Sequence, residues 1–192
     1  LARFAPTLTV FFALRSETDA EILDSVAADA QRELAKFDLV ITTYGLVRRQ
    51  DWLTKMKWSL AMLDEAQAIK NAGSAQTRGV KKIAATGRIV LTGTPVENHL
   101  GDLWSLFDFC SPGLLGSATQ FKQFAKRLNK QQDSQAFGAL RRLVRPYILR
   151  RMKTDPNIVP DLPDKTEMRT ECGLSKKQAV LYEKAVKDLA DR

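Results

Sequence analysis

One short apolar run, ending in two adjacent carboxylates, constrains this chain more than any other feature. Residues Trp58 to Leu63 are almost wholly apolar and read as a strand buried on both faces of a sheet. Asp64 and Glu65 follow directly at its carboxyl end. Open α/β sheets place their chemistry at the carboxyl ends of their strands, so these two residues mark a candidate site.

The carboxylate pair has two interpretations. In phosphoryl transfer, one carboxylate holds Mg²⁺ through its waters, while its neighbour orients or deprotonates the attacking water. The alternative is a solvated turn after a strand, in which Asp and Glu are ordinary residues. The rest of the chain has to decide between the two.

A second strand and turn follow further along the chain. Arg88 to Leu91 is a short apolar run that opens into Thr92-Gly93-Thr94-Pro95. Two hydroxyls flanking a glycine, at the end of a neighbouring strand, suit the sensing of a phosphate or water beside a metal site. A plain turn explains the glycine and the proline equally well.

Taken together, the two segments resemble a known pair of motifs. Asp64-Glu65-Ala66-Gln67 and Leu91-Thr92-Gly93-Thr94-Pro95 are similar to motifs II and III of superfamily two helicases. Further words narrow the resemblance to the Swi/Snf-type family of DNA-translocating ATPases, and the match covers most of the chain from Asp38 onward. These words are Ile69-Lys70-Asn71, Val96-Glu97-Asn98, Leu103-Trp104-Ser105-Leu106-Phe107, residues 145–153 and Leu162-Pro163-Asp164-Lys165.

The resemblance implies roles for individual residues. Asp64 would hold Mg²⁺ through water, and Glu65 would activate the attacking water. Gln67 would bridge the site to motif III, although many relatives have His at this position and Gln occurs in others. The sensing and coupling residues would be Thr92, Gly93 and Thr94.

One candidate contact with DNA lies at the end of an earlier strand. Asp38 to Tyr44 reads as a strand that ends in Thr42 and Thr43, whose hydroxyls can bond a phosphate backbone. The resemblance makes this segment motif Ib, which touches DNA in the family. The alternative is ordinary strand-end Thr, favoured by β-propensity.

A second candidate for DNA contact is a concentration of positive charge. Between Lys122 and Lys153 there are ten basic residues and one acidic residue, a net charge of +9, while the remaining chain carries 20 basic and 21 acidic residues. This distribution is typical of a phosphate-binding surface, with a solvated helical face as the alternative. The predicted contacts within it are Lys122, Lys126, Arg127 and Lys130.

Strands and helices alternate along the first half of the chain. Strands are expected over Leu8 to Ala13, Asp38 to Tyr44, Trp58 to Leu63 and Arg88 to Leu91. Helices are expected from a capping box at residues 18–21 to about Phe37, over Leu46 to Met56 and over Ala75 to Ala85. This alternation predicts βαβ units, a parallel sheet and an α/β fold. The resemblance makes it a partial RecA-like helicase lobe with a helical appendage.

After Asn98 the strand pattern stops. An apolar helix should end at Ser111-Pro112-Gly113, two helices over residues 117–145 should carry the basic cluster, and an amphipathic helix should run from Ser175 to the end. Four prolines between residues 146 and 163 mark an irregular stretch. We expect three regions: a partial ATPase lobe at 1–112, a basic helical protrusion at 113–155, and a segment leading to a second lobe at 156–192.

The sequence lacks one element that an ATPase of this class needs. It contains no Gly-Lys-Ser or Gly-Lys-Thr word, the phosphate loop whose backbone N–H groups and lysine cradle the phosphates of ATP. The second lobe, which supplies arginine fingers in the family, is also missing. We therefore expect a fragment of the first motor lobe, inactive alone. Its parent would be a DNA-dependent ATP hydrolase that uses ATP, Mg²⁺, double-stranded DNA and the second helicase lobe of the same chain.

Two other functions stay open. A non-catalytic nucleic-acid-binding or scaffold module would keep the fold without the activity, but it would have no chemical need for Asp64 or Glu65. A strand-separating helicase or an RNA helicase shares motifs II and III. Only the resemblance of Lys70-Asn71 and of residues 149–153 argues against that second alternative.

Composition adds general limits. With 44% hydrophobic residues and mixed charges, the chain is expected to be an intracellular globular protein, nuclear in a eukaryote or cytoplasmic and nucleoid-associated in a prokaryote. Cys110 and Cys172 form no ligand cluster with the single histidine, His99, so reduced thiols are expected rather than a zinc site. No apolar run reaches the length of a membrane span.

The predicted sheet should have an exposed edge. In sheets of this class the strand leading into the sensing motif lies beside the strand of the phosphate loop, which this sequence does not contain. Ile89, Val90 and Leu91 would then stand on an unpaired edge, which favours self-association. The alternative is that the run from Leu8 to Ala13 covers this edge.

Overall fold

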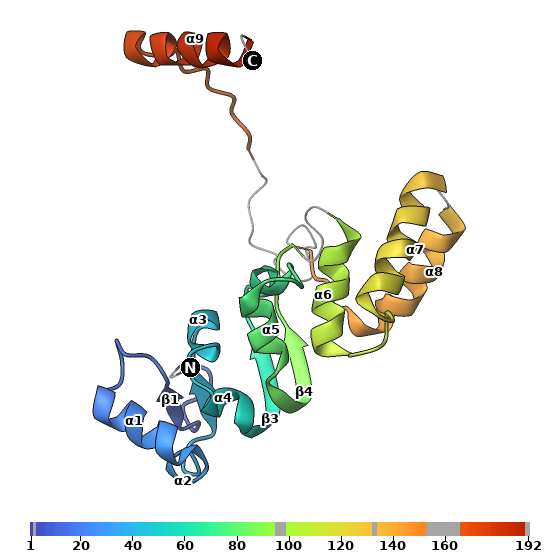
Figure 1. The fold of residues 1–192 in the computed structure, drawn as a ribbon. Helices are drawn as coiled ribbons and strands as arrows, with labels where there is room; N and C mark the ends of the chain where they lie inside the picture. The colour runs from blue at the N-terminus through green and yellow to red at the C-terminus, as the bar shows by residue number, and fades with distance from the viewer. Residues whose placement is uncertain (2, 95–98, 132–133, 153–165, 191–192) are drawn as a thin grey trace. The chain divides into compact units, whose positions relative to one another are not determined.

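The structure is a computed structural model that describes residues 1, 3–94, 99–131, 134–152 and 166–190 (Figure 1). The chain forms two compact units, Leu1–Leu140 and Arg141–Arg192. In the described residues the strands are β1 (Val10–Phe12), β2 (Leu39–Ile41), β3 (Lys57–Leu63) and β4 (Ala84–Val90). The helices and 3-10 turns are α1 (Ala20–Ala28), α2 (Ala30–Glu33), α3 (Tyr44–Val47), α4 (Trp52–Lys55), η1 (Ala66–Ile69), α5 (Ala75–Lys81), α6 (Leu100–Cys110), α7 (Ala118–Gln131), α8 (Ser134–Val144), η2 (Arg145–Tyr147) and α9 (Lys176–Ala190).

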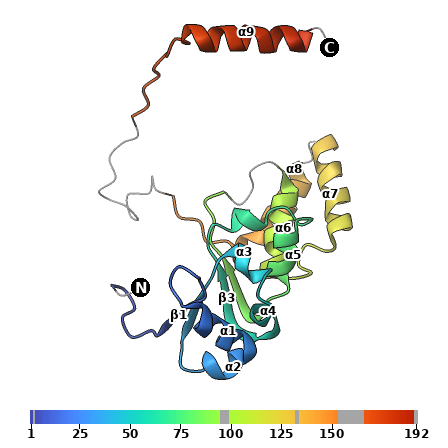
Figure 2. The same ribbon diagram turned by 60° about the vertical axis from the view of Figure 1, so that its left-hand side comes forward.

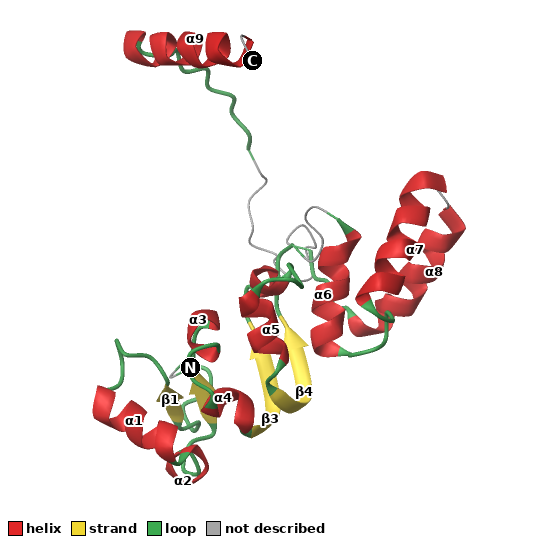
Figure 3. Ribbon diagram, in the orientation of Figure 1, coloured by secondary structure: helices red, strands yellow, loops and turns green. Residues whose placement is uncertain are grey.

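The strands pair two by two, and both pairs are parallel (Figure 3). β1 lies beside β2 with Val10 opposite Leu39, and β3 lies beside β4 with Leu63 opposite Val90. Helices α1 and α2 connect the first pair, while η1 and α5 connect the second. The predicted α/β class with parallel βαβ units is confirmed. A single continuous sheet was also expected, whereas the described residues form two separate two-stranded sheets.

One face of the β3–β4 sheet is covered, and the other is open. The core joins Leu63 and Val90 to Val80 of α5 and Phe109 of α6. The side chains that alternate with these residues point away from the helices, because successive residues of a strand face opposite sides of its sheet. They are Leu60, Met62 and Ile89, exposed by 48%, 55% and 41%. The prediction that Trp58 to Leu63 is buried on both faces is therefore wrong for the described residues.

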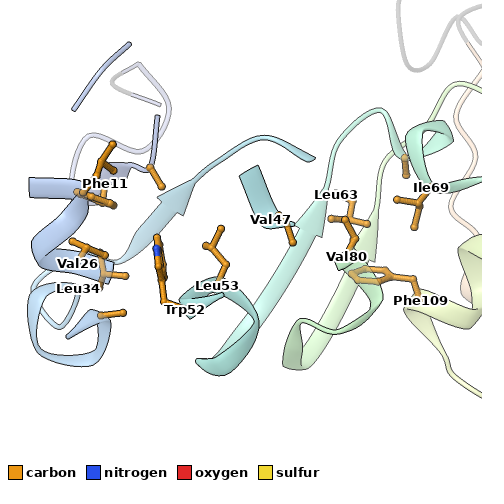
Figure 4. Packing of buried hydrophobic residues seen from close by; sticks show 14 of the residues in the cluster. Phe11, Val26, Leu34, Val47, Trp52, Leu53, Leu63, Ile69, Val80 and Phe109 are labelled. Atoms are coloured by element: carbon orange, nitrogen blue, oxygen red, sulfur yellow. The ribbon is translucent and has the colours of Figure 1, made fainter. Parts of the chain in front are cut away.

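A hydrophobic cluster runs through the first unit and supports both sheets (Figure 4). At one end, Phe11 of β1 and Val26 of α1 lie near Trp52 of α4. At the other, Ile69 and Phe109 are fully buried beside Val80. Because η1, α5 and α6 all contribute to this second half, the ends of β3 and β4 stand on a packed base.

The first predicted helix is interrupted, as the turned view of the ribbon also shows (Figure 2). α1 ends at Ala28, because Asp29 leaves the helical region (φ −145°, ψ 71°) and accepts a hydrogen bond from the backbone N–H of Arg32 at the start of α2. The predicted capping box is also wrong. Asp19 is the N-cap residue and makes no side-chain cap bond, while the hydroxyl of Thr18 donates to the carbonyl of Phe12 (2.6 Å).

Two other predicted helices are shorter than expected. In place of one helix over Leu46 to Met56 there are two short helices, α3, which begins earlier at Tyr44, and α4. The carbonyl of Leu53 in α4 accepts a hydrogen bond from the indole N–H of Trp58 (2.9 Å). The helix predicted to reach Ala85 ends at Lys81, because residues from Ala84 onward pair with β3. Strand pairing overrides the high helix propensity of alanine here.

The predictions for the second half of the chain are largely confirmed. α6 ends where Ser111 leaves the helical conformation, and two helices cover most of residues 117–145 as α7 and α8. A helix also begins after Ser175, as α9, with its apolar side chains exposed. The prolines at 156, 160 and 163 lie outside the described residues. No helix in the part of the chain that is described is both long and apolar enough to span a membrane.

The edge of β4 is not covered by the N-terminal run. β1 pairs with β2 through Val10, Phe11 and Phe12, so the alternative in which the run from Leu8 to Ala13 covers β4 is wrong. In the described residues β4 has β3 as its one neighbouring strand.

Candidate functional site

Asp64 and Glu65 lie where β3 and β4 end together, and both are exposed. Backbone hydrogen bonds continue beyond the strands on either side of them. The N–H of Leu91 donates to the carbonyl of Leu63 (2.8 Å), and the N–H of Ala66 donates to the carbonyl of Leu91 (2.9 Å). Leu91, just after β4, is therefore bonded to the residue before the two carboxylates and to the residue after them.

Glu65 has a backbone conformation that L-residues rarely adopt. Its φ of 48° and ψ of 50° are left-handed, and among the described residues it is the one non-glycine with positive φ. This conformation costs roughly 1–2 kcal/mol relative to the right-handed region. Strained residues of this kind cluster at functional sites and persist where the surrounding structure holds them.

Gln67 joins the carboxylate turn to the end of β4. Its amide nitrogen donates to Oε2 of Glu65 (2.6 Å), and its amide oxygen accepts a hydrogen bond from the hydroxyl of Thr92 (2.9 Å). The amide uses its donor and its acceptor at once, and a carboxylate at that position would repel Glu65. The structure thus brings together three residues that the sequence analysis placed in two motifs.

Tyr44 is a site residue that the sequence analysis missed. Its hydroxyl donates to the backbone carbonyl of Asp64 (2.7 Å). Burial, together with the nearby carboxylates of Asp64 and Glu65, raises the pKa of Tyr44 to about 12. The only sequence signal was its position after the two threonines, since nothing local to residue 44 indicates a partner twenty residues away.

Asp64 has the chemistry of a magnesium ligand. Its Oδ1 accepts the backbone N–H of Glu65 (2.9 Å), and its carboxylate is exposed at the strand end. Among the described residues no group of three or more His, Cys, Asp or Glu could hold a metal by itself. Mg²⁺ is usually held by one or two carboxylates, substrate phosphates and water, so this donor set fits it.

The remaining predicted sensing residues, Gly93 and Thr94, lie in the turn after β4. Thr94 donates its backbone N–H to the hydroxyl of Thr92 (3.2 Å), which fixes the start of the turn after β4. A Cβ added at Gly93 would meet nothing within 4 Å, so packing in this structure does not require a glycine there. Pro95, the last residue of the predicted motif, and the word Val96-Glu97-Asn98 that follows it lie outside the described residues.

Thr42 and Thr43 follow the carboxyl end of β2, just as Asp64 and Glu65 follow the carboxyl end of β3. The hydroxyl of Thr42 donates to the carbonyl of Ala13 (3.4 Å). Thr43 is exposed and precedes α3 as its N-cap residue, with no side-chain cap bond. Of the two predicted DNA contacts, Thr43 therefore has the freer hydroxyl.

The four basic residues predicted to touch DNA lie on a different element from the carboxylates. Lys122, Lys126 and Arg127 are carried by α7, which contacts α6. The side chain of Lys130 lies outside the described residues. α3, which follows the threonines, contacts α5 instead. The two predicted DNA-contacting regions are therefore attached to different helices of the first unit.

Comparison with known proteins identifies the family. A model described as the SNF2-related domain matches residues 1–191. The chain belongs to this family. The resemblance stated from motifs II and III is thereby confirmed, and so is a RecA-like lobe as the fold.

Individual relatives match this SNF2-related domain over most or all of its length. It is 41% identical, over 193 residues that cover 100% of the chain, to the putative ATP-dependent helicase/translocase YwqA of Bacillus subtilis. It is 39% identical to the DNA repair and recombination protein RAD26 of Saccharomyces cerevisiae, over 84% of the chain. The chain spans only 20% and 15% of the lengths of these two proteins.

A solved structure shows the same fold. The SNF2-related domain aligns with the Sulfolobus solfataricus SWI2/SNF2 ATPase core in complex with double-stranded DNA, with a TM-score of 0.69 and 38% identity. The alignment covers 100% of this chain and 38% of the Sulfolobus chain. A second structure, of the Sulfolobus solfataricus SWI2/SNF2 ATPase core domain, gives a TM-score of 0.63.

Proposed function

We propose that this SNF2-related domain supplies the metal-holding, water-activating and sensing residues of an ATPase that moves along double-stranded DNA. The observation that carries the proposal is the hydrogen-bonded line from Glu65 through Gln67 to Thr92. These hydrogen bonds join the carboxylate of Glu65, the candidate base after β3, to the hydroxyl of Thr92 after β4. A surface turn has no chemical need for such a line or for the strained backbone of Glu65.

The roles divide according to chemistry. ATP is the nucleotide that the SNF2 ATPase family implies, and Mg²⁺, held by Asp64 through water, would stabilise charge on the transferred phosphate. Glu65 would take the proton of the attacking water, and Gln67 would orient the Glu65 carboxylate. Thr92, Gly93 and Thr94 would respond to the presence of the phosphate. Their backbone and hydroxyl groups stand at the end of β4 beside the carboxylate turn.

The DNA-contacting residues would act through phosphate oxygens. Thr42 and Thr43 would donate hydroxyl hydrogen bonds, and Lys122, Lys126, Arg127 and Lys130 would supply charge. Such contacts position a protein on the duplex without reading its sequence. The proposed regions are the partial ATPase lobe at 1–112, the basic protrusion at 113–155, and the segment toward a second helicase lobe at 156–192.

Hydrolysis by the 192-residue chain alone is not expected, because it has no Gly-Lys-Ser or Gly-Lys-Thr phosphate loop. The test is a chimera in which this chain replaces the matching segment of the Bacillus relative, assayed for ATP turnover with and without duplex DNA. Glu65→Gln should lower turnover by about 100-fold or more while nucleotide binding persists, because the amide cannot accept a proton. Glu17→Gln, at a carboxylate distant in sequence from the site, is the matched control.

Two results would contradict this proposal. One is a Glu65→Gln chimera with the turnover of the unsubstituted chimera. The other is magnesium-dependent ATP hydrolysis by the 192-residue chain itself, because that activity would need no phosphate loop.

The open face and edge of β4 also favour self-association. Ile89 and Leu91 are 41% and 46% exposed beside a strand edge with no further strand in the described residues. Unpaired edges and contiguous apolar surface promote pairing with another chain. Sedimentation velocity should show a concentration-dependent dimer that Ile89→Lys weakens, and a strict monomer at all concentrations would exclude this association.

A further inference from the structure

The carbonyl of Asp64 is held by a residue from a distant part of the chain. The other hydrogen bonds of the carboxylate turn join it to nearby residues of the turn and η1, Gln67 among them, or to the end of β4. Tyr44, by contrast, follows β2 and reaches the turn with its hydroxyl, 2.7 Å from the carbonyl oxygen. It connects the β2–α3 segment to the residue that carries the proposed metal ligand.

Tyr44 directly follows the two threonines proposed to touch DNA. Thr43 is the N-cap of α3, and Tyr44 is the first residue of that helix. The ring is part of the packing around the hydrophobic core, and a tyrosine ring has only two side-chain torsions. A displacement of the Thr43 backbone would therefore be passed to the Tyr44 hydroxyl, because a packed ring with two torsions has little freedom to absorb it.

The carboxylate turn is sensitive to the loss of an anchor. Glu65 is held in a left-handed conformation that is intrinsically unfavourable, so its position depends on the surrounding bonds. Asp64 and Glu65 are adjacent, and a shift of the peptide between them changes the direction of both carboxylates. The hydroxyl of Tyr44 is bonded to the carbonyl of that peptide, at Asp64.

We propose that Tyr44 is a positioning residue that transmits contact of DNA with Thr42 and Thr43 to the geometry of Asp64 and Glu65. This inference rests on the proposed function for its DNA contact, but not on the basic cluster of α7. The coupling element is one hydrogen bond between two segments, and its removal leaves both segments otherwise intact.

The test removes only this hydroxyl. Tyr44→Phe is compared with Tyr182→Phe, which removes the hydroxyl of a tyrosine that is 67% exposed on α9. Amide resonances of the ¹⁵N-labelled chain are followed while a short duplex is added. In the unsubstituted chain, Thr43 and the pair Asp64 and Glu65 should shift with one midpoint.

In Tyr44→Phe, the shift at Thr43 should persist while the shifts at Asp64 and Glu65 fall several-fold, and Tyr182→Phe should change neither. Undiminished shifts at Asp64 and Glu65 in Tyr44→Phe would overturn the coupling and leave the proposed DNA contact standing. A duplex that binds without shifting Thr43 would overturn both the contact and the coupling.

A second variant covers the case in which Tyr44→Phe fails to fold. Thr43→Val changes the contact residue and keeps the Tyr44 hydroxyl. Its duplex-induced shifts at Asp64 and Glu65 should fall together with the shift at residue 43. Retention of the Asp64 and Glu65 shifts when Thr42 and Thr43 are both replaced by Val would overturn the proposal, because the signal would then reach the carboxylates by another route.

Discussion

The carboxylate turn and the basic face of α7 are built in opposite ways. Around Asp64 and Glu65, backbone and side-chain groups are tied to β4, Gln67 and Tyr44, over a base of fully buried side chains. On α7, Lys122 and Arg127 project from an exposed helix face. The difference matches the proposed chemistry of each region, because water activation needs atoms held at fixed positions, whereas attraction of a polyanion needs only charge.

The largest expected effect comes from shortening a buried side chain beneath the carboxylate turn. Ile69 ends η1 with 0% exposure, and Ile69→Ala should lower the free energy of unfolding by about 2–5 kcal/mol, because it leaves a cavity in the core. Ile22→Ala, at a residue 50% exposed on α1, removes the same atoms and should cost less than about 1 kcal/mol. Urea unfolding measures both. Equal losses would show that the turn has no special support.

Removing charge from the basic face of α7 should change the salt dependence of duplex binding and not the stability of the fold. Replacing Lys122, Lys126 and Arg127 by Gln should reduce the slope of log K for duplex binding against log salt by about 0.9 for each lost phosphate contact. The folded state should be nearly unaffected, because these side chains lie outside the buried core. A matched control neutralises three exposed lysines of α9: Lys177, Lys184 and Lys187. An unchanged slope would reassign these α7 residues to packing against another domain of the parent or to a protein partner.

The smallest effect concerns pH. The pKa of Tyr44 is raised from 10.0 to about 12 in the folded chain, so the folded state keeps a proton that the unfolded state loses between these values. Stability from this group is therefore fully present below pH 10 and is lost as pH rises toward 12. Unfolding midpoints should decline over this range more steeply in the unsubstituted chain than in Tyr44→Phe. Parallel declines would show that the hydroxyl is not linked to folding.

Local patterns predicted the parts of the fold that depend on local order. The run before Asp64 forms β3, and the apolar residues after Leu100 form α6, because strand and helix periods are visible within a short stretch of sequence. The break at Asp29 and the start of β4 at Ala84 were missed. The start of β4 is decided by pairing with β3, a contact between segments distant in sequence that overrides propensity.

The residues of the candidate site also divide into those whose proximity the sequence could predict and those whose proximity it could not. Asp64, Glu65 and Gln67 follow one strand, so their proximity was predictable from adjacency alone, and parallel strands bring Thr92 to the same edge. The contact of Tyr44 with Asp64 was not predictable, because it depends on how α3 packs against α5. The open face of β3 was missed for a related reason, since an apolar strand pattern does not reveal which helices are present to cover it.

We propose that Asp64 holds a divalent cation, through water, beside the end of β4. Mn²⁺ added at millimolar concentration to the ¹⁵N-labelled chain should broaden the amide resonances of Asp64, Glu65 and Thr92 together, because paramagnetic relaxation reports proximity directly. Asp64→Asn should abolish this broadening, and Asp51→Asn, at an exposed carboxylate elsewhere, should leave it unchanged. Broadening that survives Asp64→Asn, or that appears at other residues and spares these three, would contradict the account.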